Sequence, residues 1–223
     1  MRSRLLPAGM LAAAVATAVL VSGCSSGDDW SAPHAKPIPV GTLGPGFFPS
    51  TSPAPESTIT PRPRSWDGVH PPEDYRVVLL TAGSDPQTKT LVSAVTKWAE
   101  EERVSLKTIT ATAPSQYIPR ISEAIDLAPD LVISAGNDLI DPLALVTANH
   151  LGRQFLVIGA ELAEPTANVT AADWTGAAFR GEGLGMSSAY DPATFTPERA
   201  GRAVRAGVAA VLHGMTGIVI WLD

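Results

Sequence analysis

The sequence predicts an α/β fold, a three-layer α-β-α sandwich with a mostly parallel sheet. From Tyr75 onward, short apolar runs alternate with stretches of helical periodicity, and small or polar residues separate the two. The clearest unit is Pro129 to Asp141, where the apolar run at 131–133 ends at Gly136 and a new apolar pattern follows Asn137-Asp138. Such alternation implies right-handed crossovers and a sheet that is covered on both faces.

Each expected element has its own local signal. The apolar runs predict strands at 75–81, 104–110, 131–134, 154–159, 167–172 and 217–222. The helical patterns predict helices that begin near Asp85-Pro86, at 115–119, near Leu139 and at Thr196-Pro197, where a capping residue before a proline marks two of the starts. Residues 173–196 are expected to be irregular, and the glycines at 181, 183 and 185 match no phosphate-binding motif.

Composition excludes several classes of function. From residue 73 onward the chain has eighteen acidic and eleven basic residues, so this part is acidic and a nucleic-acid partner is not expected. The sequence has one cysteine and four scattered histidines, which exclude a disulfide framework and a Cys/His zinc site. We expect no metal and no cofactor.

The first 23 residues predict a secretory signal. A basic start at 1–4 precedes an Ala-rich apolar stretch, and small residues lead to Cys24. This arrangement resembles the lipobox of bacterial lipoproteins, which implies that Cys24 is acylated and becomes the first residue of the mature chain. We therefore expect a lipid-anchored protein on the extracytoplasmic face of the cell membrane, because several acyl chains give stable anchoring.

Residues 24–72 are expected to form the lipidated N-terminus and a disordered tether. Proline alternates there with Ser, Thr, Gly and Ala, and no helical or strand period is present. A flexible coil of this length would span roughly 40 Å and hold the domain clear of the membrane. Four aromatic residues stand out: Trp30, Phe47, Phe48 and Trp66. We interpret them as incidental or close to the lipid, and the alternative is that they dock onto the domain or onto a partner.

Residues 73–223 are expected to form one domain, and this part resembles a known family. The segments Gln116 to Gly136, Phe155 to Ile158 and Asn168-Val169, with the stretch from Thr196 to Val219, are similar to the basic membrane lipoproteins. These are substrate-binding lipoproteins with a type 1 periplasmic-binding-protein-like fold. The resemblance implies a single N-terminal lobe, since two lobes need about twice this length. The family's aromatic residue for nucleoside binding has no counterpart after Asp85.

The carboxyl ends of the expected strands form the candidate binding rim. In open α/β sheets ligands gather at this edge, and the residues there with polar side chains are Ser84, Asp85, Asn137, Asp138 and Glu161. Asp85 and Asn137 have a second interpretation, in which each only caps its helix.

The predicted function is non-catalytic binding or sensing of a small solute. No nucleophile motif and no metal cluster points to an enzyme. The alternative is a surface-displayed protein-interaction module or a homodimer, because a single lobe leaves exposed the face that would meet its twin. The arginines at 199, 202 and 205 recur on one helix face and are interpreted as solvated.

Overall fold

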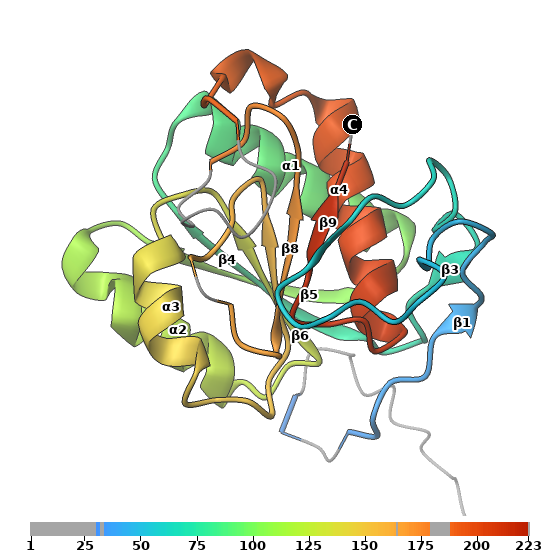
Figure 1. Cartoon of the computed structure of the whole chain (residues 1–223). Helices are drawn as coiled ribbons and strands as arrows, with labels where there is room; N and C mark the ends of the chain where they lie inside the picture. Colours follow the sequence, from blue (N-terminus) through green and yellow to red (C-terminus); the bar gives the residue numbers. More distant parts are fainter. Residues whose placement is uncertain (1–29, 32–33, 164, 179–187, 223) are drawn as a thin grey trace, which may run out of the picture.

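A computed structural model describes residues 30–31, 34–163, 165–178 and 188–222 (Figure 1). The chain folds around a seven-stranded, fully parallel sheet with the order β2-β9-β8-β7-β6-β4-β5. Its strands are β2 (Thr58–Ile59), β4 (Arg76–Ala82), β5 (Ser105–Ala111), β6 (Leu131–Ala135), β7 (Phe155–Ile158), β8 (Val169–Asp173) and β9 (Val219–Trp221). A separate two-stranded antiparallel sheet pairs β1 (Val40–Gly41) with β3 (Val69–His70).

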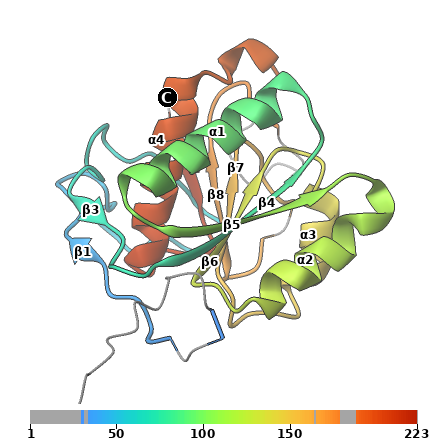
Figure 2. The same ribbon diagram turned by 180° about the vertical axis from the view of Figure 1, so that it is seen from behind.

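Four α-helices cover the sheet in two layers, as Figures 1 and 2 show. Helices α1 (Pro86–Glu101) and α4 (Pro197–Leu212) share one apolar core with Val77 and Leu79 of β4. The other face carries α2 (Tyr117–Asp126) and α3 (Ile140–Thr147), together with the remaining β4 side chains. Because successive residues of a strand point to opposite faces, β4 is apolar on both sides. The predicted three-layer α-β-α fold is confirmed.

The order in which the chain adds strands to the sheet reverses between β4 and β6. Strands β6 to β9 follow one another in sequence order, whereas β5 lies on the far side of β4. The connections from β4 through α1 and from β6 through α3 therefore leave on opposite faces of the sheet. A crevice at the carboxyl ends of the two strands is the usual binding position in open α/β sheets.

The segment expected to be a disordered tether is packed against the domain over much of its length. Phe47 and Trp66 are buried in the same core as α1 and α4, with ring centroids 6.4 Å apart. Strand β2 adds a parallel edge strand beside β9, and Ile59 is buried. This corrects the expected boundary at residue 73. The composition is poor in regular structure, but a few large apolar side chains supply enough burial to fix irregular backbone.

Residues 1–29 lie outside the described part of the chain, and so does Cys24 with its expected lipidation. The same holds for the Gly-rich stretch at 179–187. Within the ranges that the structure describes, none of the helices combines the length and the apolar character needed to span a bilayer.

Candidate functional site

A cavity of about 510 Å³ lies at the crevice between β4 and β6. Its wall combines the first turn of α1, the turn after β6, the end of β7 and the irregular segment before α4. The lining residues are Asp85, Gln87, Thr88, Leu91, Gly136, Asn137, Asp138, Gly159, Ala178, Tyr190 and Phe195. The volume is in the range of sites for small molecules.

Glycines with positive φ end three neighbouring strands at this edge. Gly83, Gly136 and Gly159 follow β4, β6 and β7 with φ of +83°, +100° and +72°. A Cβ at Gly136 would lie 2.7 Å from Thr88 Oγ1, and one at Gly159 would lie 2.9 Å from the Phe195 ring. The absent side chains thus leave room for the first turn of α1 and for Phe195 against the strand ends.

Asp85 is held by the helix that it caps. Its Oδ1 accepts a 2.8 Å hydrogen bond from the Thr88 backbone N–H, and its Oδ2 accepts one of 2.7 Å from the Thr88 hydroxyl. Partial burial raises the pKa of this carboxyl, but the hydrogen bonds from Thr88 and nearby backbone groups outweigh it and leave the pKa below its ordinary value. Asp85 is thus anionic and fixed in place at neutral pH.

A second carboxylate converges on the same point. A Cβ at Gly83 would lie 2.9 Å from Asp138 Oδ2 and 3.2 Å from Asp85 Oδ2. The two oxygens are therefore at most 6.1 Å apart, the sum of these distances. Two exposed carboxylates at this spacing can together accept hydrogen bonds from a hydroxyl-bearing or amino-bearing molecule.

Asn137 does not cap a helix with its side chain, which corrects one of the two interpretations. Helix α3 begins at Ile140 with Leu139 as its N-cap, and no side chain caps it. The Asn137 backbone carbonyl accepts from the Ile140 N–H at 3.3 Å, while the residue itself lines the cavity. Ser84 is exposed and lies next to Asp85 in the chain but does not line the cavity.

An aromatic wall faces these polar groups. Tyr190 packs against Phe195 with ring centroids 5.8 Å apart, and Phe195 meets Trp174 edge to face at 5.1 Å. Trp174 is buried, whereas Tyr190 remains 55% exposed at the rim. Partial burial and the nearby Asp85 charge raise the pKa of the Tyr190 hydroxyl. No sequence signal predicts this wall, because its residues come from a segment without periodicity.

Glu161 lies beneath the rim and not in the cavity, which corrects its expected place. It is buried, as is Asp173 at the end of β8, and their side chains share a hydrogen bond. Burial raises the pKa of Glu161 to about 7 and, helped by the charge of Glu161, also raises the pKa of Asp173 well above its ordinary value. Within the described residues, Glu161 Oε1 and Asp173 Oδ1 are buried without a hydrogen-bond partner. A carboxyl pair of this kind holds a proton.

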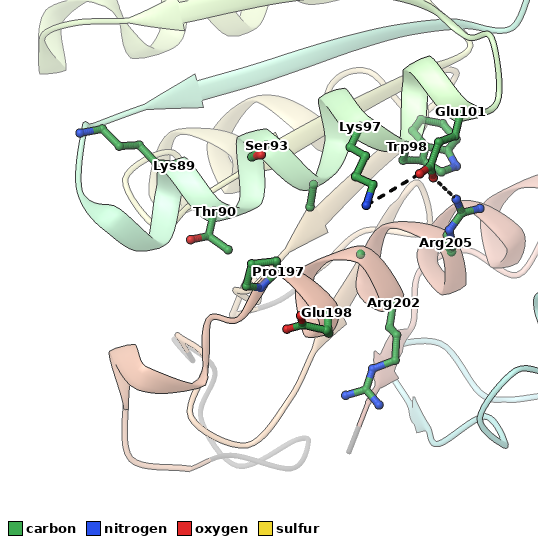
Figure 3. A pocket seen from close by; sticks show the side chains of 12 residues that line it. Lys89, Thr90, Ser93, Lys97, Trp98, Glu101, Pro197, Glu198, Arg202 and Arg205 are labelled. Carbon is green, nitrogen blue, oxygen red and sulfur yellow. Dashed lines mark hydrogen bonds and ion pairs between the residues drawn. The ribbon is translucent and has the colours of Figure 1, made fainter.

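A second hollow of about 540 Å³ lies between α1 and α4 (Figure 3). Arg205 reaches from α4 to two residues at the end of α1 and pairs with Glu101 at 2.5 Å and Glu102 at 2.6 Å. Lys97 also approaches Glu101, at 3.9 Å. The expectation of a solvated arginine face therefore fails for Arg205, which links the two helices. We interpret this hollow as the groove of a helix pair, not as a binding site.

The described residues contain no group of three or more metal-binding side chains. The two carboxylates near Gly83 stand apart from the described histidines, which contact other parts of the chain: His34 bonds to Asp130 and His70 to Glu102. The chemistry that the site offers is hydrogen bonding and aromatic contact.

Comparison with known proteins gives likenesses of fold. No known family profile matches the sequence, and no curated protein matches it. Among solved structures, a protein described as a lipoprotein fragment from Peptoclostridium difficile 630 is 15% identical, with a TM-score of 0.43 over 62% of this chain and 98% of that one.

Two of the other similar structures are solute-binding proteins of ABC transporters. The one from Aeropyrum pernix K1 is 19% identical with a TM-score of 0.41, over 45% of this chain and 29% of that one. The one from Actinobacillus succinogenes 130z, solved with D-allose, is 15% identical with a TM-score of 0.32, over 66% and 57%. The chain thus spans about a third to a half of these two. These three solved structures are described as solute-binding proteins of ABC transporters and as a lipoprotein.

Proposed function

We propose that this protein is a lipid-anchored extracytoplasmic protein that binds a small neutral or cationic solute through hydroxyl or amino groups. The observation that carries the proposal is the convergence of Asp85 and Asp138 on Gly83 opposite Tyr190, in a cavity at the reversal point of the sheet. Carboxylates accept hydrogen bonds from hydroxyl and ammonium groups and repel anions. An aromatic face adds apolar contact for the carbon skeleton of such a solute.

Binding without catalysis is the form of the proposal that the side chains support. Asp85 is committed to Thr88 through both oxygens, and its lowered pKa makes it a poor proton acceptor at neutral pH. Among the described residues, no serine, cysteine or histidine lines the cavity. The two carboxyl groups of raised pKa in this region, Glu161 and Asp173, are buried under the rim.

A thermal-shift screen with monosaccharides, nucleosides, polyols and small amines tests the proposal. A ligand at one hundred times its Kd stabilises a protein by about 2.7 kcal/mol, which for a domain of this size raises Tm by roughly 5–10 °C. Tyr190→Ala and Asp138→Asn should each reduce the shift without unfolding the protein, because both residues are exposed. Glu198→Gln, an exposed change on α4, is the matched control. The absence of a shift with any of these compounds would contradict solute binding.

The lipid anchor is tested separately. Cys24→Ala should abolish acylation and either release the protein from the membrane or leave the precursor uncleaved. Phase partitioning and the mass of the purified N-terminal peptide give the two readouts. Unchanged membrane retention and unchanged mobility on a gel would overturn the assignment.

A protein-interaction module or homodimer is the second candidate. The observation in its favour is Tyr190, a large aromatic side chain that is 55% exposed beside an open cavity. Exposed aromatic residues are enriched in interfaces. Size-exclusion chromatography with light scattering distinguishes the two: a dimer that Tyr190→Ala converts to a monomer would favour this candidate. A monomer that binds a solute would favour the first.

A further inference from the structure

The first described residues are bonded to one end of the sheet. Trp30 is buried, and its indole Nε1 donates a 2.9 Å hydrogen bond to Ser105 Oγ at the start of β5. Its ring lies 4.4 Å below the Lys107 ammonium, and its carbonyl accepts from Arg76 at 3.3 Å. Burial, two hydrogen bonds and a cation–π pair together fix this residue on the domain.

A second attachment follows four residues later. His34 Nε2 lies 2.8 Å from Asp130 Oδ2, and the same oxygen accepts from the Arg76 backbone N–H at 2.8 Å. Arg76 begins β4 and Asp130 directly precedes β6. Both attachments therefore lie at the amino-terminal ends of the strands. Figure 1 shows the corresponding blue segment below the sheet, at the opposite end from the close of β9.

The length of chain between this attachment and the expected anchor is short. Trp30 follows Cys24 by six positions, and six extended residues span at most about 20 Å. A tether reaching from residue 24 to residue 72 is thus not what separates the domain from the lipid. Whatever path the intervening residues take, Trp30 cannot lie farther than this from the acylated residue.

The candidate site lies at the other end of the same strands. Strand β4 runs for seven residues from Arg76, beside Trp30, to Ala82, which precedes the Gly83 turn. A strand of this length spans about 23 Å. Leu151, which lies shortly before the start of β7 at the amino-terminal edge, is an apolar side chain that is 61% exposed and is suited to an interfacial position.

We propose that the amino-terminal edge of the sheet, held by Trp30 and His34, lies against the lipid headgroup surface, so that the cavity opens away from the membrane. The inference rests on the proposed lipid anchor at Cys24. In this arrangement the domain is not held at the end of a long tether. Its orientation is set by the six residues that lead to Trp30. A solute would then reach the cavity from the aqueous side without passing between protein and membrane.

Energy transfer from single labelled sites to a lipid acceptor tests the orientation. With its only cysteine acylated, the lipidated full chain in phosphatidylcholine–phosphatidylglycerol vesicles can carry one introduced cysteine, Leu151→Cys at the amino-terminal edge or Ser84→Cys at the carboxyl edge. The two labels should differ in height by about 20 Å, so transfer from position 151 should be severalfold stronger. Equal, weak transfer from both sites would overturn the proposal, and so would stronger transfer from position 84.

Two further arms separate this inference from the anchor itself. Vesicle flotation reports anchoring alone, and failure to float would contradict the proposed anchor before any orientation is measured. Trp30→Ala should leave flotation unchanged but lower energy transfer from position 151. Without the Trp30 contacts, the chain is first attached to the domain farther from residue 24, so the domain can lie farther from the lipid. Transfer that is unaffected by Trp30→Ala and by His34→Ala together would contradict the role assigned to this attachment.

Discussion

Glu161 and Asp173 share a hydrogen bond between two carboxyl groups that are both almost completely buried, with exposed fractions of 4% and 1%. Two negative charges cannot be accommodated there, so the folded protein keeps a proton that the unfolded chain would release. The pair supports the ends of β7 and β8, close beneath the cavity rim.

The first prediction is a loss of stability as pH rises. Burial raises the pKa of Glu161 from 4.5 to about 7, so its contribution to stability is complete below pH 4.5 and is lost as pH passes through about 7. Glu161→Gln should therefore reduce the decline in Tm across this window, relative to wild type. Glu198→Gln, at an exposed position, should leave the decline unchanged. Thermal denaturation at several pH values gives the slopes, and identical slopes for Glu161→Gln and wild type would contradict the shared proton.

The second prediction concerns the adjacent phenylalanines that test the packed N-terminal segment. Phe47 is 1% exposed and Phe48 is 52% exposed. Phe47→Ala should cost about 3–5 kcal/mol because it empties a buried aromatic site. Phe48→Ala should cost less than about 1 kcal/mol. Urea denaturation measures the free energy of unfolding of both variants. Equally small losses for the two would favour a disordered tether over a packed segment.

Asn168 gives the third prediction. Its side-chain amide donates to the backbone carbonyls of Thr147, His150 and Arg153 at 3.0–3.2 Å and so fixes the loop from α3 to β7. Asn168→Ala removes the side-chain donor that these three carbonyls share and that ties the loop to the start of β8, and it should cost about 2 kcal/mol. Asn149→Ala removes an exposed amide from the same loop and should stay within about 0.5 kcal/mol. Chemical denaturation compares the two, and similar losses would contradict the assigned role.

The fourth prediction addresses the glycine at the end of β7. Gly159 has φ of +72°, and a Cβ there would lie within 3.1 Å of Phe195, Leu91 and Trp174. Gly159→Ala should destabilise the protein by about 2 kcal/mol through backbone strain and displacement of the aromatic wall. Gly152→Ala, where a Cβ meets nothing within 4 Å, should be close to neutral. Thermal unfolding gives the difference, and equal stability of the two variants would contradict the close packing assigned to Gly159.

The regular elements were predictable because their signals are local. Asp85-Pro86 and Thr196-Pro197 do start α1 and α4, and both capping side chains accept from the expected backbone N–H groups. The apolar runs mark the strands themselves, since a strand that is buried on both faces requires consecutive apolar residues. The α/β class follows from their order.

What escaped prediction depends on tertiary contacts. Phe47 and Trp66 lie in a Pro-rich segment whose composition resembles a linker, and only their shared pocket reveals them as core. Tyr190 and Phe195 reach the cavity from a segment with no period. Glu161 follows β7 as a rim residue would, yet the chain turns it inward to meet Asp173. No local sequence pattern predicts these tertiary contacts.

Strand β2 has a consequence for how copies of this protein meet. Thr58 and Ile59 pair with Val219 and Ile220 along the side of β9 that β8 leaves open. An uncovered β9 would present unpaired backbone groups on which a second chain could add a strand. By occupying that side with only two residues, the Pro-rich segment blocks the addition of a strand from another copy at this edge of the sheet.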